Sequence, residues 1–244
     1  MGTFKISVDR FSWICGPEDD PDDRCLHGHV AVQIGENVME GDGTVSATAL
    51  YLLKSLKEDK RMSPHSIQMV PCCGFFLIAN EELSEVSIDG CDNGMDWSVV
   101  HEDAGVRLIL PSGESELVSV QDYREEVVRF ADKVERYYRS CLPKTIPENE
   151  FDRNGYIAFW NEWYRRYADA VLADALEKGR EIELQYGGMD YFISHDRESG
   201  WYLYCEQTKE KQTFRSPGDL YDQGRLGRHL LKDELAGIRI CCVL

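Results

Sequence analysis

The fold of the first part of the chain is decided by the stretch His29-Val30-Ala31-Val32-Gln33-Ile34-Gly35-Glu36-Asn37-Val38-Met39-Glu40. Apolar and polar residues alternate on both sides of Gly35-Glu36, and such a pair between two alternating runs is typical of a hairpin turn. The stretch therefore predicts a β-hairpin. Further out, the same alternation predicts a strand before it, at Phe4, Ile6 and Val8. After the hairpin, Thr44 is a candidate N-cap, and helical spacing follows at Val45, Ala49, Leu52, Leu53 and Leu56.

From about residue 67 onward, short runs of period two alternate with turn signals such as Asp89-Gly90 and Ser112-Gly113. Strands are expected over residues 67–70, 74–79, 83–88, 97–101, 106–110 and 116–120. Short strands with tight turns between them predict an antiparallel meander or a curled sheet.

Two long helices are expected to follow these strands. Ser119 and Asp122 resemble a capping box at the start of the first, whose apolar stripe begins at Tyr123. The second is expected from about Gly155 to Lys178. Its aromatic residues 156, 160, 163 and 167 share one helical face, so we expect them in the core, while Phe159 points elsewhere.

The last part of the chain has a pattern of its own. Strands over residues 182–186, 189–194 and 201–205 predict a three-stranded meander, followed by a helical turn near 219–223, a helix over 226–235 and a strand over 238–240. We therefore predict an α+β fold: an acidic module of antiparallel sheet with flanking helices over 1–167, and a small α+β module over 168–244.

Composition indicates a globular protein, with 43% hydrophobic and 29% charged residues. The longest apolar run is too short to span a bilayer, and the first residues resemble a strand rather than a signal peptide, so we expect a cytoplasmic protein away from membranes. Nine cysteines, an odd count without an export signal, are expected to be reduced and mostly structural. This expectation includes Cys72-Cys73, which lies between strands.

The net charge is −17, of which residues 1–167 carry −13 and residues 168–244 carry −4. Nucleic-acid binding is disfavoured because it needs clustered Lys and Arg. An acidic first module instead attracts a basic protein by long-range steering. The candidate contact surface is the acidic loop, with Glu18, Asp19, Asp20, Asp22 and Asp23. The alternative interpretation is that the acidity serves only solubility.

The sharpest candidate for chemistry is Cys25-Leu26-His27-Gly28-His29. In an extended strand, Cys25, His27 and His29 project to the same face, and a thiol with two imidazoles is a possible zinc site. A strand whose histidines bond to backbone or solvent is the competing interpretation. No phosphate loop, dinucleotide fingerprint, serine-hydrolase elbow or H-E-x-x-H motif is present.

Four stretches, Leu26 to Val30, Thr44 to Leu53, Pro71 to Gly74 and Asp152 to Tyr156, together resemble uncharacterised bacterial proteins associated with immunity partners of polymorphic toxins. The resemblance implies a non-catalytic protein that binds and blocks a basic toxin, and it carries over no catalytic residues. Two alternatives stay open: a zinc enzyme centred on Cys25, His27 and His29, and a structural or regulatory module.

Overall fold

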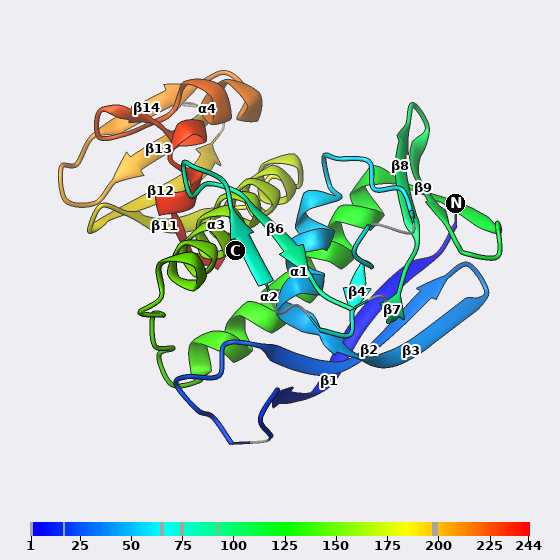
Figure 1. The fold of residues 1–244 in the computed structure, drawn as a ribbon. Helices are drawn as coiled ribbons and strands as arrows, with labels where there is room; N and C mark the ends of the chain where they lie inside the picture. The colour runs from blue at the N-terminus through cyan, green and yellow to red at the C-terminus, as the bar shows by residue number, and fades with distance from the viewer. Residues whose placement is uncertain (1, 17, 64–65, 74–75, 92, 197–199) are drawn as a thin grey trace. The chain divides into compact units, whose positions relative to one another are not determined.

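A computed structural model describes residues 1–244 except 1, 17, 64–65, 74–75, 92 and 197–199. The chain forms two compact units, Met1–Trp160 and Asn161–Leu244, whereas we expected the boundary after residue 167. Each unit combines helices with antiparallel strands, so the predicted α+β class is confirmed (Figure 1). Among the described residues, no helix combines the length and apolar composition needed to cross a membrane.

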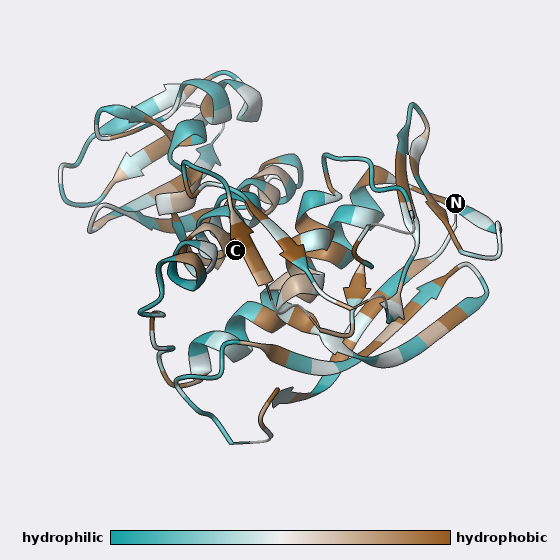
Figure 2. Cartoon of the chain, viewed as in Figure 1, coloured by the Kyte–Doolittle hydropathy of each residue, from teal (hydrophilic) through white to brown (hydrophobic). Residues whose placement is uncertain are grey.

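The first sheet has the order β1-β2-β3, with β1 Phe4–Trp13, β2 Leu26–Ile34 and β3 Asn37–Thr44. All its pairs are antiparallel, and Gly35 takes a φ of +61° in the hairpin turn, a conformation in which glycine has no steric cost. Apolar and polar bands alternate along these strands (Figure 2). The predicted hairpin and the strand before it are therefore confirmed. The alternation in the sequence arises because one face of this sheet is buried.

Two helices pack on the buried face of this sheet, α1 Val45–Lys54 against β2 and α2 Val120–Ser140 against β1 (Figure 1). Ser119 caps α2 as expected, since its Oγ accepts a hydrogen bond from the amide of Asp122 at 3.0 Å. Thr44 stands at the N-cap of α1, but its side chain makes no capping bond. Eight of the ten residues of α1 are buried, so packing rather than capping stabilises this helix.

Among the described residues, the remaining strands of the first unit form three small antiparallel sheets rather than one meander. Their bounds are β4 Val70–Pro71, β5 Phe76–Ala79, β6 Val86–Asp89, β7 Gly94–Met95, β8 Ser98–Glu102, β9 Gly105–Ile109 and β10 Ser115–Val118. The sheets are β4-β7, β5-β6 and β10-β9-β8. Gly74, with which we expected one strand to begin, lies outside the described residues.

Helix α3 spans Glu150–Glu177 and starts earlier than we expected. Asn149 precedes it, and its Oδ1 accepts hydrogen bonds from the amides of Phe151 at 2.9 Å and Asp152 at 3.2 Å. We expected the helix to start at about Gly155. It lies inside the helix instead, where a Cβ would overlap the carbonyl oxygen of Leu77 in β5.

The second unit is a five-stranded antiparallel sheet in the order β14-β13-β12-β11-β17. Its strands are β11 Ile182–Tyr186, β12 Met189–Asp196, β13 Gly200–Cys205, β14 Lys211–Phe214 and β17 Arg239–Val243. Apolar side chains of the sheet form one core with Ala168, Leu172 and Leu176 of α3 and with Leu220 of helix α4 (Pro217–Gln223).

The predicted meander is present in this sheet, but two other predictions for the second unit were incomplete or wrong. Strand β14 was missed, since its alternation is short and polar. The helix predicted over 226–235 is wrong: the segment contains the hairpin β15 (Arg225–Leu226) and β16 (His229–Leu230), followed by the short 3-10 helix η1 (Leu231–Asp233). Gly227, with a φ of +62°, forms the hairpin turn, and η2 (Leu235–Gly237) leads to β17.

We expect Gly155→Ala to lower the free energy of unfolding of the first unit by about 1–3 kcal/mol, as overpacked cores do. The reason is that the new methyl group meets backbone rather than a flexible side chain. In an exposed helix the same substitution stabilises by up to about 1 kcal/mol. Urea denaturation followed by circular dichroism measures the difference.

Gly218→Ala is the matched control, because a Cβ at this position of α4 lies 3.8 Å from the nearest atom, Ser216 Oγ. We expect no loss of stability there. An equal or greater stability of Gly155→Ala compared with the unmodified protein would contradict the close contact of α3 with β5.

Candidate functional site

The first unit contains a cavity of about 320 Å³, bordered by five segments that are far apart in sequence. The segments are the loop from Ile14 to Cys25, the start of α1, the β5–β6 hairpin, the end of α2 and the start of α3. Its volume is at the lower end of the range of small-molecule pockets. The cavity is the candidate site, since carboxylates and aromatic rings from these segments converge on it.

One wall of the cavity is the acidic loop, which is held in place by Asp23. The carboxylate of Asp23 accepts hydrogen bonds from the amide of Cys15 at 2.8 Å and from the amide of Cys25 at 3.1 Å. Asp23 is only 5% exposed. Asp23 was expected in the contact surface, but its carboxylate satisfies buried backbone donors and has little surface to offer a partner.

Asp19 also has an internal role. Its carboxylate accepts hydrogen bonds from Lys144 Nζ at 2.6 Å and from the amide of Leu142 at 2.5 Å. The Lys144 side chain is 1% exposed, and its Nζ lies 3.4 Å from the centroid of the Trp13 ring. The hydrogen bonds from Lys144 and Leu142 lower the pKa of Asp19 below its ordinary value. Asp19 thus ties the acidic loop to the segment after α2.

The carboxylates that face the cavity and are exposed to solvent are Asp20 and Asp22 of the loop and Asp152 of α3. Glu18, the remaining member of the predicted surface, is exposed but does not line the cavity. Sequence reasoning missed Asp152, because its sequence position gives no sign that the start of α3 lies beside the loop.

Aromatic rings form another wall of the cavity. Trp160 makes edge contacts with Tyr138, at a centroid distance of 4.8 Å, and with Phe159, at 5.2 Å. Burial raises the pKa of the Tyr138 and Tyr156 hydroxyls, which therefore stay neutral at physiological pH. The expectation that residues 156 and 160 are core was wrong in part: both are half-buried and line the cavity, whereas Phe159 is 5% exposed.

Large apolar side chains are exposed on the segments that border the cavity. Ile14, which lines it, is 44% exposed; Ile146, next to the lining residue Pro147, is 57% exposed. Phe151, next to Asp152, is 50% exposed. Apolar surface rimmed by charge is typical of interaction sites.

The charges at the cavity favour a cation. Asp20, Asp22 and Asp152 contribute three exposed carboxylates, against the single guanidinium of Arg24, which donates a hydrogen bond to the carbonyl of Thr145 at 3.1 Å. The N-terminus of α1 adds a partial positive charge of about half a unit. The sum is negative, so the cavity attracts positively charged groups.

The structure does not bring Cys25, His27 and His29 together as a set of metal ligands. Nδ1 of His27 lies 3.0 Å from the carbonyl oxygen of Cys25, and its Nε2 lies 3.3 Å from Thr44 Oγ1. A carbonyl only accepts, so Nδ1 of His27 is the donor in its contact with Cys25. His29 instead bonds to Asp42, at 2.9 Å.

Within the described ranges, these three side chains do not form a group whose ligand atoms all lie within 4.8 Å of one another. The hydroxyl of Thr44 lies between His27 and Cys25: its Oγ1 contacts Nε2 of His27 and is 4.0 Å from Sγ of Cys25. This chain of polar contacts holds the start of β2 against the start of α1, which explains why Thr44 does not cap the helix.

Comparisons of the chain with protein-family models, with curated proteins and with solved structures found no match.

We expect Asp19→Asn to destabilise the first unit at neutral pH, because the ionised carboxylate is the form that Lys144 and Leu142 stabilise. The folded-state pKa of Asp19 is lowered, so its contribution is present above the ordinary pKa of about 3.9 and is lost as the pH falls through the folded-state value. Urea denaturation between pH 7 and pH 2 should show the two proteins converging in stability on acidification.

Asp22→Asn is the control, since the Asp22 side chain is exposed and its substitution leaves the Lys144 contact intact. Its difference in stability from the unmodified protein should be small at every pH. If the difference in unfolding free energy between Asp19→Asn and the unmodified protein stayed constant down to pH 2, the assigned pKa shift would be contradicted.

Proposed function

We propose that the chain is a non-catalytic binding protein whose cavity receives an apolar side chain flanked by Lys or Arg on a polypeptide partner. The supporting observation is the cavity of about 320 Å³, where Asp20, Asp22 and Asp152 rim a wall that includes Tyr156 and Trp160. An apolar side chain would bury its surface inside the cavity. Its basic neighbours would meet the carboxylates at the rim.

The aromatic wall adds a second reason for a basic partner. Trp and Tyr rings attract Arg or Lys placed over their faces, by about 0.5–2 kcal/mol depending on desolvation. The chain already uses this contact internally, where Lys144 lies over Trp13. A partner's cation above Trp160 or Tyr156 would be stabilised by the ring and by the neighbouring carboxylate of Asp152.

The resemblance to immunity partners of polymorphic toxins implies which kind of protein presents this segment. A basic toxin domain would be steered by the net charge of −17, and binding would block it by covering its surface. This part of the proposal rests on the sequence resemblance, whereas the chemistry of the contact rests on the cavity.

A direct test uses the peptide N-acetyl-Arg-Trp-Arg-amide and its acidic counterpart N-acetyl-Glu-Trp-Glu-amide. We expect the basic peptide to bind more tightly at low salt by about tenfold or more, and the preference to shrink as salt screens the carboxylates. The triple variant D20N/D22N/D152N should lose the preference, since two attractive pairs with Arg and two repulsive pairs with Glu, at roughly 0.5 kcal/mol each, together correspond to more than about tenfold in affinity. Fluorescence titration or NMR shift mapping measures the binding.

The matched control is E36Q/E40Q/D103N, which removes the same charge from exposed positions that do not line the cavity. It should keep most of the preference. Equal binding of the two peptides to the unmodified protein, or equal losses in both triple variants, would count against the cavity as the contact site.

The immunity role predicts protection in cells. Co-expression of the chain with the product of the open reading frame directly upstream of its gene should restore growth that the upstream product alone arrests. D20N/D22N/D152N should protect less than E36Q/E40Q/D103N, with both variants expressed at equal levels. Growth arrest that the unmodified chain fails to relieve would refute the toxin assignment without affecting the peptide result.

A further inference from the structure

Three cysteines of the first unit meet at a point that the proposed binding function does not use. Cys72 and Cys73 directly follow β4, and Cys91 lies between β6 and β7. The pairing of β4 with β7 brings them together, with Val70 opposite Met95 and the Cys72 amide donating to the carbonyl of Asn93 at 3.0 Å.

This pairing requires glycine at position 94. A Cβ there would lie 2.5 Å from the carbonyl oxygen of Val70 and 3.3 Å from the amide nitrogen of Cys72. A side chain would therefore push the two cysteine-bearing segments apart. The backbone itself holds the cysteines close to one another.

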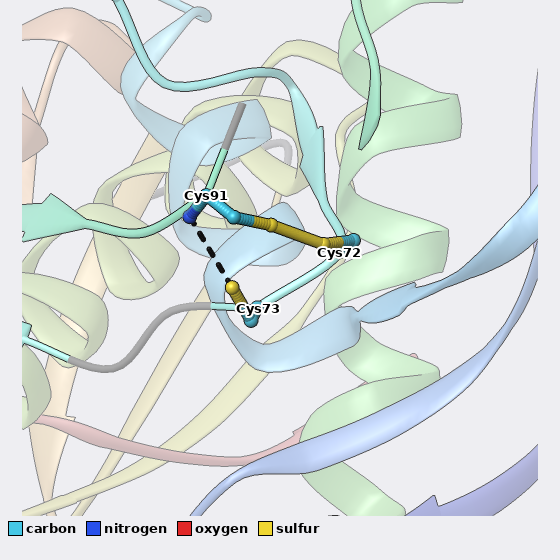
Figure 3. Close-up of side chains that lie close together, drawn as sticks. All are labelled: Cys72, Cys73 and Cys91. Atoms are coloured by element: carbon cyan, nitrogen blue, oxygen red, sulfur yellow. Dashed lines mark hydrogen bonds between the residues drawn. A yellow bond between two sulfur atoms is a disulfide. The ribbon is translucent and has the colours of Figure 1, made fainter. Parts of the chain in front are cut away.

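The Sγ atoms of Cys72, Cys73 and Cys91 all lie within 4.8 Å of one another, and all three residues are half-buried. The structure joins Cys72 and Cys91 in a disulfide, in contrast to our expectation that these cysteines are reduced, and Cys73 points toward the same place (Figure 3). The amide of Cys91 donates a hydrogen bond to Cys73 Sγ at 3.2 Å. An N–H donor directed at sulfur stabilises its anionic form, as the hydrogen bonds around metal-bound thiolates do.

We propose that, once a thiol reductant has opened the Cys72–Cys91 disulfide by supplying two electrons and two protons, Cys72, Cys73 and Cys91 lose their protons and bind one Zn²⁺ ion as thiolates. Sulfur ligands select zinc and other soft ions over Mg²⁺ and Ca²⁺. With Zn–S bonds of about 2.3 Å and tetrahedral angles, the sulfur atoms would lie about 3.8 Å apart, so the Cys72 and Cys91 sulfur atoms have to separate from the disulfide that the structure shows. The Cα atoms of Cys72 and Cys91 are 7.0 Å apart, beyond the usual disulfide span of about 4.4–6.8 Å but suitable for two ligands of one ion.

The site has an open fourth position within the part of the chain that the structure describes. There, no other His, Cys, Asp or Glu places a ligand atom in the same cluster. A water molecule would complete the tetrahedron. Zinc at this point joins the two ends of the segment that contains β5 and β6, from which Leu77 and Ile88 line the cavity. A bound ion would therefore fix the position of the β5–β6 hairpin, which forms one wall of the cavity.

The test uses the full chain, purified without oxygen, reduced and freed of metal, with Co²⁺ as a spectroscopic substitute for zinc. We expect one equivalent of Co²⁺ to produce the thiolate charge-transfer band and the visible bands of tetrahedral cobalt, and Zn²⁺ to displace it. In C72S/C73S/C91S the affinity should fall by more than about 100-fold. C241S/C242S, which changes another adjacent pair of cysteines, should bind as the unmodified protein does.

A second readout uses the unmodified protein and so does not depend on how the variants fold. Zinc should protect Cys72, Cys73 and Cys91 from alkylation, as measured by mass spectrometry, while the exposed Cys15 and Cys241 react equally with and without metal. Absence of the cobalt bands, unchanged alkylation, or a Cys72–Cys91 disulfide that persists in protein purified without oxygen would overturn the proposal.

Discussion

The candidate site depends on how the loop from Ile14 to Cys25 satisfies its own backbone and charges. A loop rich in aspartate repels itself when its carboxylates face only water. Here Asp23 accepts two backbone amides at the two ends of the loop, and Asp19 pairs with Lys144 beneath it. These contacts fix the course of the chain. Asp20 and Asp22 are left exposed at the cavity, where their charge is available to a partner.

The acids of the loop thus divide into two kinds that the sequence does not distinguish. A buried carboxylate stabilises a fold only when donors surround it, since otherwise its desolvation is costly. The buried Asp23 meets that requirement through nearby amides, whereas the half-buried Asp19 is paired with residues more than a hundred positions later. Composition predicts that the first unit is acidic, but not which of its charges face outward.

Local patterns predicted much of the fold. The hairpin at Gly35, the cap at Ser119 and the meander of the second unit follow from residues close to one another in sequence, and all three are present. The misses involve short or distant pairings. The segment 226–235 has apolar spacing suited to a helix, but the glycine at 227 favours a turn.

The site was less predictable than the fold. The local cluster Cys25, His27 and His29 has a suggestive spacing, yet Thr44 and Asp42 engage its imidazoles. The place of Asp152 at the cavity could not be predicted, because it depends on a tertiary contact between distant segments. The same holds for the cluster of Cys72, Cys73 and Cys91, whose segments share no sequence motif. The glycines were the one local sign of these tertiary contacts, because Gly94 and Gly155 lie where two backbone segments approach closely.

The contact between Gly155 and Leu77 has a consequence for how this sequence is able to vary. Helix propensity alone would let alanine replace Gly155 with a gain in stability. The carbonyl of Leu77 turns that gain into a loss, and every larger residue meets the same oxygen atom. The preference for glycine at this position is therefore set by a strand far away in the chain and not by the helix in which the residue lies.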